Sequence, residues 1–243
     1  MVEKPSQEAC DTWPVTRGIE ALELADWRRR IAELYAEVRR LASTDPPAAH
    51  ARWRATREQL YGEHPQSPVP VEDRAAFQAT YFPYKAGLRF ELPVHEPEGA
   101  PSTRAGSPVR PIQPAVGGDA AALPSSTGAA PAFERIGWVE VPFSDGRRRL
   151  SVFWLREYSG GLFLPFADAT NGGETYGAGR YLLDGAKGAD LGGNPERGTL
   201  VLDFNFAYQP SCAFDPRWAC PLAPPENRLD LAVHAGETLG VGT

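Results

Sequence analysis

The fold is decided by residues 133–158, which read FERIGWVEVPFSDGRRRLSVFWLREY. Apolar and polar residues alternate on both sides of the turn Ser144-Asp145-Gly146, which is typical of two antiparallel strands joined by a short connection. The pattern predicts further short strands at residues 88–94, 162–166, 180–183, 199–208 and 229–233. Successive short strands with short turns predict an antiparallel sheet arranged as a sandwich or partial barrel.

Upstream of these strands the spacing of apolar residues changes to three and four. A helix of roughly five turns is predicted by Leu24, Trp27, Ile31, Leu34, Val38 and Leu41. Asp45-Pro46-Pro47 breaks this helix and starts a second one at residues 46–61, which Gly62 closes. The predicted fold class is α+β, mainly β, with an N-terminal helical hairpin packed on an antiparallel β sandwich or partial barrel.

The domain organisation follows from these patterns. We expect a loose N-terminal arm at residues 1–20, the helical hairpin at 21–62 and a β-rich domain at 63–243. An insert at 97–132 interrupts that domain, because Pro, Gly, Ala, Ser and Thr make up 27 of its 36 residues without any periodicity. We interpret the insert as a tolerated loop; the alternative is a proline-rich docking segment at residues 108–114.

Charge and hydropathy exclude several classes of protein. The net charge of −6 argues against a nucleic-acid partner, which would require excess positive charge. No apolar run approaches the roughly 20 residues that span a bilayer, and residues 1–16 lack the apolar core of a secretory signal. We therefore expect a soluble cytoplasmic protein without a membrane partner; the oligomeric state is left open.

The three cysteines are Cys10, Cys212 and Cys220. An odd number of cysteines is typical of free thiols in a reducing compartment. Cys212 and Cys220 are close in one loop, so two free thiols, a local disulfide and half of a metal site are the alternatives. No histidine lies at a short ligand spacing from another ligand, so we expect no metal and no other cofactor.

Candidate ligand-binding residues concentrate in glycine-rich loops beside predicted strands. Glycine permits close approach of a ligand to the backbone, but the loop matches neither a phosphate-binding nor a dinucleotide-binding pattern. If this loop neighbours the strand at 199–208, Glu174, Tyr176 and Arg180 face Asp203, Asn205 and Tyr208 across a cleft. The alternative is a hydrogen-bond network that only anchors the loops. The candidates are Asp168, Thr170, Glu174, Tyr176, Arg180, Asp203, Asn205, Tyr208, Glu226 and Asn227.

A longer set of motifs carries a family resemblance. The motifs are Trp53-x-x-x-Arg57, His64-Pro65-x-Ser67-Pro68, Tyr81-Phe82-Pro83, the loop from Pro165 to Leu182, Asp203-Phe204-Asn205-x-Ala207-Tyr208, Cys212-Ala213, Cys220-Pro221-Leu222, Glu226-Asn227-x-Leu229 and Ala235-Gly236-Glu237. Over most of the chain from about residue 53 to 237, the sequence resembles the domain of unknown function 1684 family (DUF1684). This resemblance implies no reaction, because no activity is settled for that family.

Two functional hypotheses remain. The first is a polar cleft that binds a small polar or anionic ligand and acts on it hydrolytically, with a carboxylate as base and Arg180 as charge stabiliser. The second is a non-catalytic structural or protein-interaction module that docks through the helical hairpin or the insert. Pairing of Arg180 with Asp203 in a dry contact favours a scaffold, whereas an open cleft favours a site.

Overall fold

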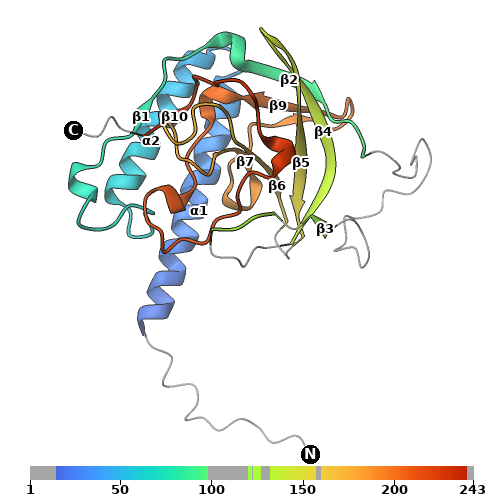
Figure 1. Ribbon diagram of the computed structural model, residues 1–243. Helices are drawn as coiled ribbons and strands as arrows, with labels where there is room; N and C mark the ends of the chain where they lie inside the picture. Colours follow the sequence, from blue (N-terminus) through green and yellow to red (C-terminus); the bar gives the residue numbers. More distant parts are fainter. Residues whose placement is uncertain (1–14, 98–119, 122, 127–131, 157–159, 240–243) are drawn as a thin grey trace, which may run out of the picture.

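The computed structural model describes residues 15–97, 120–121, 123–126, 132–156 and 160–239. Two helices, α1 (Val15–Leu41) and α2 (Pro46–Glu63), come first and are followed by three antiparallel sheets. Figure 1 shows the two helices packed on one side of the strands, with the N-terminal part of α1 extending beyond the body of the molecule. The predicted fold class, α+β and mainly β, is confirmed.

The apolar stripe of α1 faces the core as predicted. Ile31, Leu34 and Val38 are buried, whereas Leu24, nearer the extending end, is exposed. The helix begins at Val15, so residues 15–20 of the expected arm are helical, and residues 1–14 lie outside the described residues. In α2, the side chain of Asp45 accepts a hydrogen bond from the backbone of Ala48, which caps the first turn.

The largest sheet has five strands in the order β3-β4-β5-β6-β7. Its members are β3 (Ala120–Ala121), β4 (Phe133–Phe143), β5 (Gly146–Leu155), β6 (Leu162–Phe166) and β7 (Arg180–Asp184). The other sheets pair β2 (Arg89–Pro93) with β9 (Thr199–Asp203) and β8 (Gly193–Asn194), and β1 (Thr80–Tyr81) with β10 (Glu237–Thr238). The predicted hairpin is therefore confirmed as β4–β5.

Two isolated bridges connect the larger sheets. His95, just after β2, pairs with Trp138 of β4, and Tyr208, beyond β9, pairs with Tyr181 of β7. The strands of the described chain do not close into a continuous barrel. Because Tyr208 is held beside β7 in this way, its side chain has a fixed position between the sheets and the helices.

Two strand predictions are wrong in part. The strand expected over residues 199–208 ends at Asp203, because the Asp203 carboxylate accepts the backbone N–H of Asn205 and starts a 3₁₀ turn, Phe204–Phe206. The segment 229–233 is no strand: Leu229 and Leu231 make backbone hydrogen bonds with Ala167 and Ala169, but the Val233 carbonyl then accepts from the Arg180 side chain.

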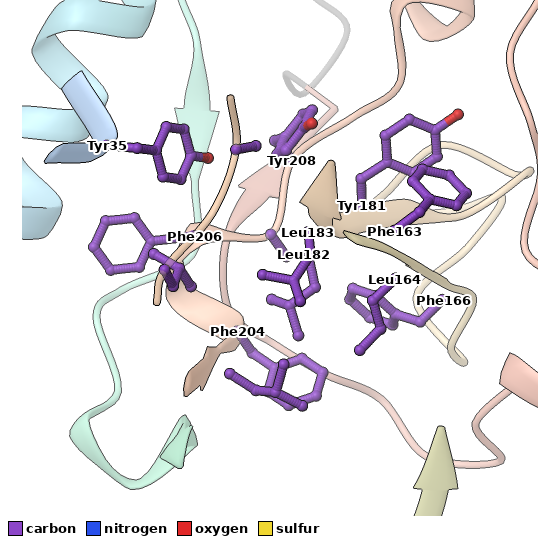
Figure 2. Close-up of a cluster of buried hydrophobic side chains, with 14 of the residues drawn as sticks. Tyr35, Phe163, Leu164, Phe166, Tyr181, Leu182, Leu183, Phe204, Phe206 and Tyr208 are labelled. Atoms are coloured by element: carbon purple, nitrogen blue, oxygen red, sulfur yellow. The ribbon is translucent and has the colours of Figure 1, made fainter. Parts of the chain in front are cut away.

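The core lies where the helices meet β6, β7 and the 3₁₀ turn. Figure 2 shows Leu182 and Leu183 in the middle, with Tyr35, Phe206 and Tyr208 on one side and Phe163 and Phe166 on the other. All are buried. The interface between the helical hairpin and the sheets is thus aromatic.

Part of the expected insert is anchored. Ala120–Ala121 pairs with β4, and Leu123 is buried. Ser126 donates its backbone N–H to the Cys220 carbonyl and accepts the Cys220 N–H on its hydroxyl. Residues 98–119, 122 and 127–131 of the insert lie outside the described residues, and so does the proposed docking segment. Across the described residues, no helix is both long and apolar enough to cross a membrane.

Candidate functional site

A pocket of about 340 Å³ lies between the helical hairpin and the loops that follow β7 and β9. Its floor is formed by buried side chains of both helices and by Tyr208, and its mouth by Arg28, Lys187 and Trp218. The lining residues are Leu24, Trp27, Arg28, Ile31, Tyr35, Arg57, Tyr61, Gln66, Pro68, Lys187, Ala189, Tyr208, Ser211, Trp218, Ala219 and Cys220.

Arg57 is the buried charge of this pocket. Helix α2 places it four residues after Trp53 and three before Leu60, on the stripe that faces the core. Its Nη2 donates to both oxygens of Glu237, at 3.0 and 3.2 Å, and to the Tyr61 hydroxyl at 2.9 Å. Burial is the largest single influence and acts to lower the pKa of Arg57, but Glu237 and the neighbouring tyrosines together outweigh it, and the pKa is raised well above its ordinary value. Arg57 is therefore a permanent cation.

Aromatic rings surround the Arg57 guanidinium. Its central carbon lies 4.5, 4.7 and 5.0 Å from the ring centroids of Tyr61, Tyr208 and Trp53. Contacts of this kind stabilise a cation in place of water. The Arg57 Nε is buried and has no hydrogen-bond partner among the described residues. One donor of the guanidinium is thus left unsatisfied beside the pocket.

Three tyrosine hydroxyls lie at the inner end of the pocket. Tyr35 accepts from the Trp53 indole at 3.1 Å, and Tyr61 accepts from Arg57. Because these two hydroxyls accept in those bonds, their own protons are available to a ligand. Tyr208 points its hydroxyl toward Asp184, at 3.4 Å. Burial raises the pKa of all three, that of Tyr61 to about 12, so they are neutral donors near pH 7.

Among the Arg, Lys, Asp and Glu side chains, the pocket wall carries positive charges only. Arg28, Arg57 and Lys187 line it, and none of its lining residues is a carboxylate. Glu237 and Asp184 lie behind the wall, where they pair with Arg57 and, at 3.6 Å, with Lys187. An anion inside the pocket therefore meets cations and hydroxyl donors first.

Cys220 adds a thiol to the same wall. Its sulfur accepts the backbone N–H of Cys212 at 3.3 Å. The thiol hydrogen bond from Cys212 is the main cause that lowers the pKa of Cys220 to about 6; burial opposes it, while the backbone N–H and the charge of Lys187 add to it. The same contact raises the pKa of Cys212, so that Cys212 keeps its proton. Both thiols are free.

The sequence-predicted loop at 168–180 is closed. Arg180 donates to Asp168 at 2.6 Å, and both side chains are fully buried. The guanidinium also donates to the carbonyls of Val233 and Ala235, and Thr170 donates to Asp168. Arg180 thus pairs with Asp168, because the loop folds back onto its own first residue, whereas the expected cleft requires an unpaired Arg180 that faces Asp203.

The second predicted set lies elsewhere. Asp203 is fully buried, with Arg89 at 3.4 Å, and burial raises its pKa. The Asn205 side chain binds the backbone N–H and carbonyl of Lys85. These contacts fix the segment before β2 to the 3₁₀ turn. The alternation that predicted a polar face here failed because both residues point into the protein.

The remaining predicted residues are dispersed. Glu174 is exposed beside His234, at 3.2 Å, and the Tyr176 backbone N–H binds the side chain of Gln209. Glu226 pairs with Arg135, while the buried Asn227 side chain binds the backbone of Ser151 and Pro165. Of the ten predicted ligand-binding residues, the structure brings Tyr208 to the pocket.

Sequence reasoning missed Arg57. A signal was present, because an arginine four residues after Trp53 falls on the apolar stripe of the second helix, where a solvated charge does not belong. For metals, the described residues contain no group of three or more His, Cys, Asp or Glu side chains able to hold an ion.

The fold and this pocket define an α+β protein, mainly β, with a cation-lined pocket between a helical hairpin and antiparallel sheets. More particularly, the chain belongs to the family described as Protein of unknown function (DUF1684), whose model matches residues 80–238. The match includes Tyr208, Cys220 and Glu237, while Arg57 lies before it.

A solved structure extends the similarity to the helices. The chain is similar to an uncharacterized protein of Haloarcula marismortui whose solution structure was determined by NMR. The sequence identity is 27%, the TM-score is 0.54, and the alignment covers 83% of this chain and 98% of the other. Among curated proteins, none matches the chain.

Proposed function

We propose that this protein binds a small organic anion with an apolar body, a carboxylate or sulfonate, in the pocket around Arg57. The observation that carries the proposal is that three cations and no carboxylate line a pocket whose wall is otherwise largely apolar and aromatic. A few convergent polar groups in an apolar concavity are typical of small-molecule sites, and 340 Å³ lies within their usual size range.

In this proposal, different lining residues bind the apolar body and the acidic group of the ligand. Trp27, Ile31 and Trp218 offer apolar surface for the body of the ligand. The hydroxyls of Tyr35 and Tyr61 offer protons to its acidic group, and Lys187 at the mouth attracts it. No hydrolytic step is part of the proposal, because Arg180, the expected charge stabiliser of that step, is bound to Asp168.

The test uses anilinonaphthalene sulfonate as a fluorescent probe and matched lysine variants. Lys187→Ala removes a charge from the mouth, and Lys85→Ala removes the same charge from an exposed position outside the pocket. We expect Lys187→Ala to weaken probe binding about threefold, the effect of one partly screened charge, and Lys85→Ala to leave it unchanged. Equal effects of the two substitutions would contradict the proposal.

A second set of measurements tests the sign of charge that the ligand must carry and the place where it binds. Decanoate should displace the probe, whereas decyltrimethylammonium, with the same chain and the opposite charge, should not. Ala219→Trp enlarges an exposed residue of the wall and should reduce probe binding by obstructing the pocket. The alternative function, a protein-interaction module, remains a prediction.

A further inference from the structure

We propose that Cys212 and Cys220 form a peroxide-reactive dithiol, in which Cys220 is oxidised first and Cys212 then closes a disulfide with it. The oxidant is hydrogen peroxide or another small hydroperoxide. This inference concerns the two thiols, and its argument does not rest on the anion proposed for the pocket.

The two thiols are arranged for this reaction. The Cys220 side chain is only 2% exposed, but it lines the pocket, which gives a small oxidant a route to the sulfur. Cys212 lies against it: the Cys212 N–H reaches the Cys220 sulfur at 3.3 Å, and the two thiols share a hydrogen bond. The resolving thiol is therefore already in place.

The backbone around Cys220 is fixed from the other side. Its N–H donates to the Ser126 hydroxyl at 2.9 Å, and its carbonyl accepts from the Ser126 backbone at 3.1 Å. The next residue, Pro221, accepts from the Tyr181 hydroxyl at 2.5 Å. These contacts fix the backbone of Cys220 at the pocket wall.

The electrostatics assign the two roles. The Cys220 sulfur accepts the Cys212 thiol and backbone N–H, and these hydrogen bonds lower the pKa of Cys220, which favours its thiolate, the nucleophilic form. The raised pKa of Cys212 keeps its proton in place. Lys187, whose charge favours the Cys220 thiolate, lines the same pocket and can also attract a departing hydroxide.

The chemistry has two steps. In the first, the Cys220 thiolate attacks one oxygen of the peroxide; an S–O bond forms, the O–O bond breaks, and hydroxide leaves and takes up a proton from solvent. In the second, the Cys212 sulfur attacks the sulfenic acid and loses its proton; the S–S bond forms, the S–O bond breaks, and water leaves. Two thiols and one peroxide thus give one disulfide and two waters.

The experiment uses the full chain with Cys10→Ser, so that only Cys212 and Cys220 contribute to the measured oxidation. Stoichiometric peroxide at about pH 7 should remove two hydrogens from the intact mass and link the peptides of Cys212 and Cys220. Oxidation should be roughly tenfold faster in the folded protein than in the same protein unfolded in guanidinium, where both thiols regain ordinary pKa values.

Two further variants separate the roles. With Cys212→Ser, peroxide should leave a sulfenic acid on Cys220 that dimedone traps; with Cys220→Ser, dimedone should label Cys212 at the slow rate of an ordinary thiol. In the unsubstituted chain, iodoacetamide should label Cys220 before Cys212, which keeps the assignment testable even where a variant fails to fold. Equal labelling of the two cysteines, or slower oxidation of the folded than of the unfolded chain, would overturn the proposal.

Discussion

Arg180 and Arg57 are both buried against a carboxylate, yet their surroundings differ. Arg180 is enclosed by Asp168 and by carbonyls of the segment from Val233 to Glu237, so its hydrogen bonds tie loops together. Arg57 shares its charge with Glu237 on one side and faces a pocket on the other. The same chemical pair therefore serves as a closed structural contact in one region and as part of an open wall in the other.

The difference shows that a dense cluster of polar residues does not by itself mark a binding site. A long loop with few apolar side chains needs buried partners for its backbone, and Arg180 and Asp168 supply them. In the pocket, by contrast, few polar groups lie among many aromatic ones, and the Arg57 cation lines a cavity. Both arginines have a buried Nε without a partner in the described chain, so the cavity beside Arg57, and not an unsatisfied donor or the number of polar residues, distinguishes the second region.

Breaking the closed pair gives the largest expected effect. Arg180→Leu leaves the Asp168 carboxylate buried without its cation and frees several carbonyls, so we expect it to lower the free energy of unfolding by about 4 kcal/mol. Urea denaturation measures this. The double variant Arg180→Leu with Asp168→Leu should recover part of the loss, because no lone charge remains. A loss below about 1 kcal/mol for the single variant would contradict the structural role.

Neutralising the carboxylate of the open pair should cost less stability and change the pocket. Glu237→Gln leaves Arg57 its three aromatic rings and the Tyr61 hydroxyl, so we expect a loss of about 3 kcal/mol in the free energy of unfolding. The Arg57 charge is then no longer neutralised, so anilinonaphthalene sulfonate should bind more tightly. Asp168→Asn is the matched variant of the closed pair, and it should not strengthen probe binding. Similar affinities in both variants would contradict the contrast between the two regions.

The fold was largely readable from the sequence, because burial imposes a period on helices and strands. The stripe of α1 and the alternation of β4 and β5 follow directly from it. The strand predictions for 199–208 and 229–233 failed at points where a side chain replaces a backbone partner: Asp203 binds the Asn205 N–H, and Arg180 binds the Val233 carbonyl. A short polar contact of this kind produces no periodic pattern in the sequence, so the pattern cannot predict it.

The candidate site was harder to read for a related reason. Polar residues near one another in sequence, such as Asp168 and Arg180, were found, but they satisfy each other. The pocket joins residues from α1, α2 and the loops beyond β7 and β9, and their proximity is a product of the tertiary fold. The sequence predicts Tyr208 as a site residue because it follows a strand. It does not single out Arg57, because the same helix also carries exposed arginines.

Acid should weaken the region of the open pair through His50. Its ring lies 5.5 Å from Phe206 and 5.8 Å from Trp53, and its Nε2 is buried without a partner among the described residues. Burial, helped by the charge of Arg54, lowers the pKa of His50 to about 4. Because the unfolded chain binds the proton first, near pH 6.5, stability falls as the pH drops from about 6.5 toward 4.

The expected loss from His50 is about 2 kcal/mol between pH 7 and pH 5. His50→Asn keeps a donor near the position of Nδ1 but does not titrate in this range. The free energy of unfolding of the variant, measured by urea denaturation at several pH values, should therefore change less between pH 7 and pH 5. Parallel pH profiles of the two proteins would show that His50 does not become charged on unfolding.

The smallest expected effect concerns Glu174, which the sequence nominated as a ligand residue. Glu174 and Lys187 have similar exposure, 54% and 48%; Glu174 contacts His234, and Lys187 contacts Asp184. Glu174→Gln should change the free energy of unfolding by less than about 0.5 kcal/mol, as expected for an exposed ion pair, and leave probe binding unchanged. Lys187→Ala should be equally neutral for stability but weaken the probe, because Lys187 lines the pocket and Glu174 does not. Weaker probe binding in Glu174→Gln would show that the loop at 168–180 contributes to ligand binding after all.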